Sequence, residues 1–169
     1  MGCVGRLILG VIAAFAALSP SVVLAREPKA ELLETAARVS GLDLSRRIVA
    51  NPGSAGHDVA GYFKVRNAGA EDLLVGMSCH CADRVELHRI DRSGARPTMI
   101  TDAAWPIPEA GVLEVRPGGA LHLMLMNFDP AKSQDGRVTL ELTFRDAGKI
   151  RADFVLAADS RAAWSKFEP

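Results

Sequence analysis

Short runs of alternating apolar and polar residues, separated by glycine and proline, dominate the chain from residue 42 onward. In the clearest run, Val138–Arg145, every second residue is apolar. Because successive side chains of a strand point to opposite faces, this run predicts a strand with one buried and one solvent-facing side. The turn 146–148 and a second alternating run, 150–154, complete a hairpin. The pattern is typical of an all-β protein.

Six earlier runs also have strand character, and no second convincing helical stretch interrupts them. These runs are residues 42–50, 59–66, 73–77, 85–90, 112–115 and 121–126. Seven or eight short strands in one small domain predict two packed sheets. We therefore expect an antiparallel β-sandwich over residues 42–157.

The first 25 residues are typical of a cleaved signal peptide. Arg6 is their only charged residue, and the apolar run 7–18 that follows is too short to span a bilayer comfortably. Small residues precede Ala25, after which we expect cleavage, and Cys3 would leave with the peptide. The alternative is a permanent membrane anchor, which the Ser-Pro-Ser break at 19–21 disfavours.

The two ends of the remaining chain carry weaker patterns. Within the segment 26–41, residues 28–39 have near-helical apolar spacing, with acidic residues early and Gly41 after the end, so we expect a short helix. Residues 158–169 are expected to be either a partly ordered tail or a docking element. The part between the two ends has the size of one domain.

Charge excludes several classes of partner. The chain has 20 basic and 20 acidic residues, and no basic block occurs anywhere. Nucleic acid and anionic membranes are therefore poor partners, and no stable membrane insertion is expected after cleavage. Only Cys79 and Cys81 remain after the signal peptide, which excludes a scaffold held by many disulfides.

The run Leu-His-Leu-Met-Leu-Met at 121–126 places unusual side chains on one strand face. If its leucines fill the core, the two-residue period turns the other three residues outward, namely His122, Met124 and Met126. The same argument places His88 outward in the run 84–88. Outward strand positions usually carry Thr, Lys, Glu or Arg, so an outward stripe of imidazole and thioethers needs an explanation.

Neutral imidazole and thioether together suit Cu(I), which is soft and accepts sulfur donors that Mg²⁺ or Ca²⁺ refuse. Thiolates bind Cu(I) harder but are lost to disulfides in an oxidising compartment. The alternative is that Met124 and Met126 fill the core and His122 is an ordinary surface residue. The six-residue run alone favours this alternative.

The chain resembles the PCuAC family of periplasmic copper chaperones. The family motif is His, ten residues, Met, about twenty-one residues, His, one residue, Met. Here ten residues separate His88 from Met99 and one separates His122 from Met124, whereas the middle spacing is twenty-two. The extra residue falls in the region 105–119. The contexts that share the resemblance are 60–62, 84–88, 116–119 and 122–126.

The resemblance implies a cupredoxin-like fold, related to immunoglobulin-like sandwiches, and no enzymatic activity. It also implies that His88, Met99, His122 and Met124 hold Cu(I), and that an exported, periplasmic monomer supplies copper to a respiratory oxidase subunit or to another periplasmic copper or thiol-redox protein. The alternatives are a copper storage or tolerance protein and a β-sandwich binding protein without metal. Electron-transfer copper sites need a Cys thiolate with two His, and the order Cys, His, Met that such sites have near the C-terminus is absent from this chain.

Cys79-His80-Cys81 lies outside the family motif and allows three interpretations. The two thiolates and the imidazole could form an accessory copper site, with Met126 as a further accessory donor and Cu(II) as a second possible ion. The cysteines could instead close a redox-active ring. The third interpretation is that they share no task.

Overall fold

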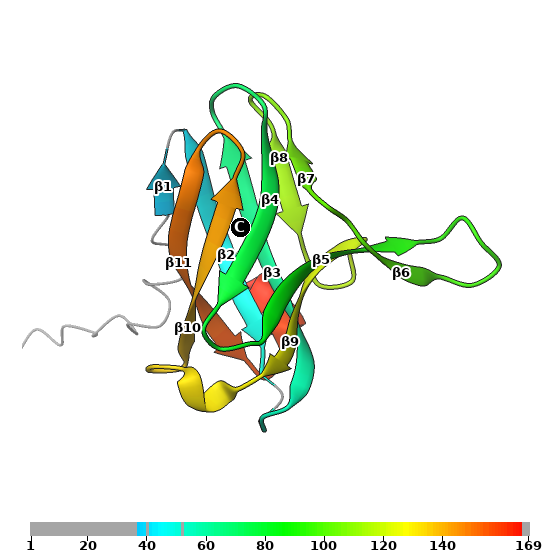
Figure 1. Ribbon diagram of the computed structural model, residues 1–169, viewed down its shortest axis with the longest axis vertical. Helices are drawn as coiled ribbons and strands as arrows, with labels where there is room; N and C mark the ends of the chain where they lie inside the picture. The colour runs from blue at the N-terminus through cyan, green and yellow to red at the C-terminus, as the bar shows by residue number, and fades with distance from the viewer. Residues whose placement is uncertain (1–36, 40, 52, 167–169) are drawn as a thin grey trace, which may run out of the picture.

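The computed structural model describes residues 37–39, 41–51 and 53–166 of the chain. This part is all-β apart from a short 3-10 turn and one short helix near the C-terminus (Figure 1). In chain order the elements are β1 Ala37–Val39, β2 Leu42–Ala50, β3 His57–Asn67, β4 Asp72–Cys79, β5 Arg84–Asp91, β6 Thr98–Thr101, β7 Trp105–Ile107, β8 Val112–Val115, β9 Leu121–Phe128, η1 Pro130–Lys132, β10 Arg137–Phe144, β11 Gly148–Ala157 and α2 Ser160–Ser165.

The strands form one closed ladder, so the prediction of two separate sheets is wrong. The hydrogen-bonded order is β1-β2-β11-β10-β4-β5-β9-β3-β8, and β2 also pairs with β3. The strands from β2 through β11, β10, β4, β5 and β9 to β3 therefore return to β2 as a barrel. Its pairing is not wholly antiparallel either, because β11 runs parallel to β2. The pairing of β4 with β5 rests on Met77 opposite Val85.

A bulge in β2 helps this strand serve two neighbours. The register with β3 shifts between Ser45 and Ile48, and Arg46 within the shift has a φ of 52°. A bulge bends its strand and increases the local twist. Beyond the bulge, residues 48–50 pair with β11 while Ile48 and Val49 still pair with β3.

Buried side chains from every strand that the alternating pattern predicts fill the barrel interior. The fully buried aromatic side chains are those of Phe63, Phe128 and Phe154, and Trp105 is 2% exposed. Trp105 begins β7, which pairs with β4. Its indole Nε1 donates to Asp102 Oδ2 over 3.0 Å.

Gly61 allows β3 and β9 to approach closely at the centre of the barrel. A Cβ atom at this position would lie 3.1 Å from Leu123 Cδ1 and 3.2 Å from Leu125 Cδ1. The two leucines therefore pack directly over the β3 backbone, and neither is exposed. This packing holds the apolar face of β9 inward.

The predictions for the two ends have different outcomes. The signal peptide and most of the predicted helix lie outside the described residues, but the last three residues of that helix, Ala37–Val39, form β1 and pair with β2. At the other end, α2 lies against β2, its Trp164 is buried, and Arg46 lies over the indole at 5.2 Å. Among the described residues, no helix is long and apolar enough to cross a membrane.

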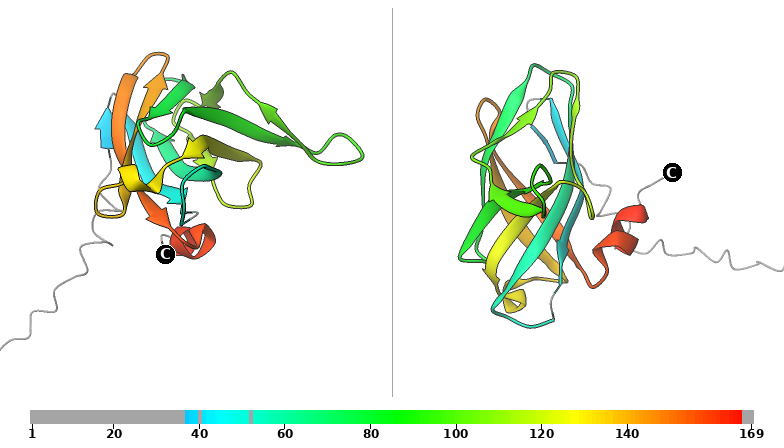
Figure 2. Two further views of the ribbon diagram at one scale, coloured as in Figure 1. Left: turned by 60° about the horizontal axis from the view of Figure 1, so that its bottom comes forward. Right: turned by 90° about the vertical axis from the view of Figure 1, so that its right-hand side faces the viewer.

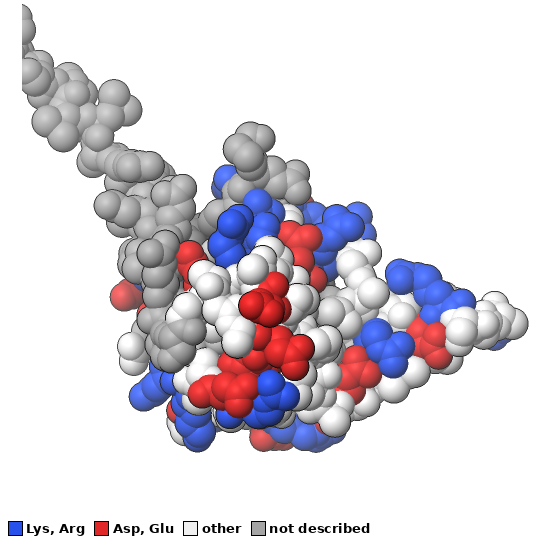
Figure 3. All heavy atoms as spheres, turned by 90° about the horizontal axis from the view of Figure 1, so that it is seen from above, with Lys and Arg blue, Asp and Glu red and all other residues white. Residues whose placement is uncertain are grey.

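A hairpin arm made of the end of β5, residues 92–97 and β6 projects from the barrel (Figures 1 and 2). All four residues of β6 are exposed. Acidic and basic side chains alternate along the arm and are mixed on the face seen from above (Figure 3). Acidic side chains gather near the middle of that face, and basic side chains lie around them (Figure 3).

Asp72, at the start of β4, is a buried carboxylate that joins two loops. Its oxygens accept hydrogen bonds from the backbone N–H groups of Leu73 at 2.7 Å, Asp146 at 3.0 Å and Ala147 at 3.0 Å. Burial alone would raise the pKa of this carboxyl, but the three N–H donors and Arg145 together hold the pKa below its ordinary value.

We expect Asp72→Asn to lower the free energy of unfolding by about 1–3 kcal/mol at neutral pH, because an amide cannot accept all three bonds. A group with a lowered folded pKa stabilises above its unfolded pKa, so this difference should shrink as the pH falls through the folded value. Urea unfolding of both proteins across this pH range measures the effect. The control, Asp146→Asn, removes an exposed carboxylate and should change little; an equal loss in both variants would contradict the role of Asp72.

Candidate metal centre

The β5–β9 ladder brings the two predicted histidine ligands together. The strands pair antiparallel, and His88 lies directly opposite His122. Their rings meet edge to face with centroids 5.7 Å apart. On β9, Leu123 and Leu125 are fully buried, whereas the alternate residues His122, Met124 and Met126 are only partly buried. The two-residue period therefore places all three on the outward face.

Met124 lies beside this pair on the same face. It is opposite Glu86 of β5, one step along the strand from the His88–His122 pair. Side chains two residues apart on a strand lie about 7 Å apart at the backbone, and diagonal cross-strand neighbours lie about 7–8 Å apart. His122 and His88 are thus both neighbours of Met124. Three of the four predicted ligands form one cluster.

Met99 occupies the far side of His88, on the arm. It lies in β6 opposite Ile90 and is 64% exposed. Met99 is therefore a diagonal neighbour of His88. Two strand spacings and four residues separate Met99 from Met124, which places their Cα atoms roughly 16 Å apart on regular strand dimensions. Bending of the arm toward β9 would shorten this distance.

Glu86 fixes the hydrogen-bonding role of His88. Glu86 Oε2 lies 2.8 Å from His88 Nε2, and Arg84 also bonds to the carboxylate. The hydrogen bond from Arg84, and next that from His88, hold the pKa of Glu86 below its ordinary value. An ionised carboxylate accepts a hydrogen bond from Nε2–H, and a neutral ring protonated on Nε2 has its lone pair on Nδ1. Among the described residues, buried Nδ1 of His88 has no hydrogen-bond partner.

His122 is suited to bind a metal at neutral pH. Burial first, and then the neighbouring His88, lower the pKa of its imidazole from the ordinary 6.5. The ring is therefore neutral near pH 7, and no proton must be displaced before it ligates. His122 and Met124 line a groove of about 330 Å³ together with Ala60, Tyr62 and Arg116, so both are accessible from outside.

The accessory candidates lie elsewhere, with one exception. Met126 is on the same face of β9 but one further step from His88, opposite Arg84. Cys79, His80 and Cys81 lie at the turn between β4 and β5, and the two cysteines form a disulfide. In this oxidised form they offer no thiolate to a metal.

Sequence reasoning missed Glu86, which bonds to His88 Nε2. It also missed Thr101, which lies opposite His88 on β6. The signal for Glu86 was present, because residues two apart on a strand share a face. Thr101 could not have been found in this way, since the pairing of β6 with β5 depends on an arm whose residues do not alternate between apolar and polar.

The arrangement fits the chemistry of a soft ion. Two imidazoles and a thioether share one surface cluster, a second thioether stands next to it, and one buried imidazole nitrogen lacks a partner among the described residues. Nitrogen and thioether sulfur form a donor set for copper rather than for Mg²⁺ or Ca²⁺.

Comparison with known proteins agrees with this architecture. Residues 42–156 match the family described as "Putative lipoprotein LpqE-like". No curated protein matches the chain.

Solved structures with similar folds include three PCuAC domains or proteins. The copper-bound PCuAC domain from PmoF2 is 20% identical, with a TM-score of 0.59 over 72% of this chain and 97% of that one. The apo PCuAC domain from PmoF1 is 18% identical, with a TM-score of 0.58 over 72% and 98%. The Cu(I) form of DR1885 from Deinococcus radiodurans is 23% identical, with a TM-score of 0.53 over 78% and 87%. At these identities the likeness shows the fold.

If burial and His88 are the two causes of the low pKa of His122, His88→Gln should remove only the second. We expect the pKa of His122 to rise in this variant but to stay below 6.5. NMR titration of the ring protons in metal-free protein measures this. His57→Gln, a change in an exposed residue of β3, is the control and should leave His122 unchanged. If His88→Gln left the pKa of His122 unchanged, His88 would not be a cause of the lowered pKa.

Proposed function

The chain belongs to the LpqE-like family, and from this premise we propose that it is a noncatalytic Cu(I)-binding chaperone. The observation that carries the proposal is the cross-strand pair of His88 and His122 with Met124 beside it on one outward face. The copper-bound PmoF2 domain and Cu(I)-DR1885, whose folds this chain shares, support copper as the cargo.

We propose His88, Met99, His122 and Met124 as the ligands. Glu86 orients His88 through Nε2, and the lone pair on Nδ1, which is buried and has no hydrogen-bond partner among the described residues, is the one proposed to bind the ion. His122 is uncharged and therefore adds no repulsion. Met99 completes the set when the arm bends toward β9, which its exposure on β6 permits.

Release is as important to a chaperone as binding. Thioethers are neutral, so they hold Cu(I) less strongly than thiolates do and can give it up to a thiolate-rich acceptor. One of the four proposed ligands, Met99, lies on the projecting arm. Movement of the arm away from β9 would therefore withdraw Met99 and open the site without disturbing the barrel. We propose that the acceptor is a periplasmic copper protein, in particular the dinuclear copper centre of a respiratory oxidase.

The proposal predicts a selective effect of thioether removal. Met99→Leu with Met124→Leu should weaken Cu(I) binding at least tenfold, about 1.4 kcal/mol or more, and should weaken Cu(II) or Zn²⁺ much less. Met-to-Leu changes nearly conserve volume, so the fold should survive. Competition with a chromogenic Cu(I) chelator measures the affinity, and copper-edge X-ray absorption measures the loss of sulfur scattering.

Met126→Leu is the matched control, because it removes a thioether from the same strand face one step farther along. Its Cu(I) affinity should stay within twofold of the parent. Absence of bound Cu(I) in the parent would favour a metal-free binding protein. Several ions per chain, with no transfer to an acceptor, would favour storage.

Export is a separate part of the proposal. We propose a periplasmic location, with the segment through Ala25 removed. Intact-mass measurement on protein purified from the cell envelope should therefore give a chain that begins at Arg26. A mass that includes residues 1–25 would contradict cleavage and favour an anchored protein.

A further inference from the structure

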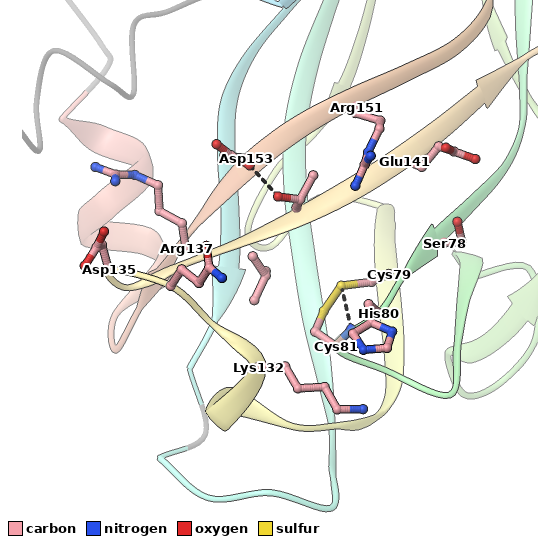
Figure 4. A pocket seen from close by; sticks show the side chains of 13 residues that line it. Ser78, Cys79, His80, Cys81, Lys132, Asp135, Arg137, Glu141, Arg151 and Asp153 are labelled. Carbon is pink, nitrogen blue, oxygen red and sulfur yellow. Dashed lines mark hydrogen bonds between the residues drawn. A yellow bond between two sulfur atoms is a disulfide. The ribbon is translucent and has the colours of Figure 1, made fainter.

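The Cys79–Cys81 disulfide faces a pocket that the proposed copper function does not use. The pocket has a volume of about 550 Å³, within the range of small-molecule sites, and lies against β10, β11 and the turn after β4 (Figure 4). No residue that lines it also lines the groove beside His122. The pocket is therefore separate from the proposed copper site.

The two sulfur-bearing residues differ in accessibility. Cys81 is only 2% exposed and belongs to the hydrophobic core, whereas Cys79 is partly buried. The backbone N–H of Cys81 donates to Cys79 Sγ over 3.1 Å. A hydrogen bond of this kind favours negative charge on a sulfur, so it would stabilise a thiolate at Cys79. Cys79 thus has the character of the reacting cysteine and Cys81 that of the buried partner.

Hydrogen bonds hold the turn independently of the disulfide. The carbonyl of Cys79 accepts from Ala82 N–H at 3.4 Å, and that of Cys81 accepts from Asp129 N–H at 2.8 Å. The N–H of Asp83 also donates to the carbonyl of Met126 over 3.0 Å. The turn can therefore keep its shape when the S–S bond opens.

The pocket wall is polar and carries both signs of charge. Lys132 lies near the disulfide, and Arg137 and Asp135 lie on the far side of the pocket (Figure 4). Arg137 Nε is buried and has no hydrogen-bond partner among the described residues. Because this Nε is not accessible, a ligand carboxylate would pair with the cationic side chains that line the wall, Lys132 and Arg137. A zwitterionic peptide has the matching groups.

We propose that Cys79–Cys81 is a thiol–disulfide exchange site for a thiol-bearing peptide held in this pocket. The peptide thiolate attacks Cys79 Sγ, the Cys79–Cys81 bond breaks, and Cys81 leaves as a thiolate that takes up a proton. A second peptide thiolate then attacks the peptide sulfur of the mixed disulfide and releases Cys79. Overall, two peptide thiols are oxidised to one peptide disulfide, and the protein disulfide is reduced to two thiols.

Single-cysteine variants test which sulfur reacts. Full-length mature protein with Cys81→Ser keeps Cys79, and the variant Cys79→Ser keeps Cys81. With oxidised glutathione as the probe, mass spectrometry should show the mixed disulfide forming at least tenfold faster on Cys79 than on Cys81. Equal rates, or a faster reaction at Cys81, would overturn the assignment. Circular dichroism should be unchanged in both variants. The double variant Cys79→Ser with Cys81→Ser, which has no thiol to compete for copper, should keep the Cu(I) binding of the parent, and this separates the result from a failure of the copper proposal.

A second comparison tests the pocket. In the Cys81→Ser background, Arg137→Gln should slow the reaction with oxidised glutathione at least fivefold and leave the reaction with uncharged hydroxyethyl disulfide within twofold. Lys132→Gln, at an exposed position of the wall, should act in the same direction if Arg137→Gln fails to fold. Arg145→Gln, outside the pocket, is the control and should change neither rate. Identical behaviour of the charged and uncharged probes in all variants would overturn peptide binding, as would a parent disulfide that excess reduced glutathione leaves intact.

Discussion

The register between β5 and β9 is the constraint on which the proposed centre depends. Leu123 and Leu125 are fully buried and Leu87 is 4% exposed, so their side chains fix which face of each strand is inward. A slip of one residue would exchange the faces and turn the imidazoles into the core. The free energy that keeps His88 opposite His122 therefore comes from the burial of these leucine side chains. The histidines themselves contribute little to it.

Much of the barrel could be predicted because its strands alternate strictly. The alternating pattern alone predicts β9 and β10, and their fully buried side chains lie at the apolar positions of that pattern. The closure of the sheet could not be predicted, because it depends on the bulge at Arg46 and on β2 pairing with both β3 and β11. Short β6 was missed for another reason, since all of its residues are exposed and no alternation marks them.

The candidate centre was predictable to a similar extent. Side-chain period placed His122 and Met124 on one face, and the spacing of the motif added His88 and Met99. Which strands are neighbours is a long-range property, so the opposition of His88 and His122 and the diagonal position of Met99 required the structure. Glu86 illustrates the remaining gap. Its outward direction could be deduced, but its bond to His88 Nε2 depends on rotamers that a sequence pattern does not specify.

The fold separates two kinds of sulfur chemistry that interfere when they share a site. A thiolate near the proposed copper site would bind Cu(I) more tightly than thioethers do and would lose this ability on oxidation. Here the two cysteines of the described residues bond to each other at the β4–β5 turn, where they line a pocket together with residues of β10 and β11. The thioethers and imidazoles lie instead on the outward face of β5 and β9. Oxidation or reduction of Cys79 and Cys81 consequently leaves the donor set of the other face chemically unchanged. The disulfide turn is linked to the other face through two strands. β5 begins at Arg84 just after the turn and carries His88 in its middle, and β9, which carries His122 and Met124, accepts a hydrogen bond from Asp83 N–H at the carbonyl of Met126.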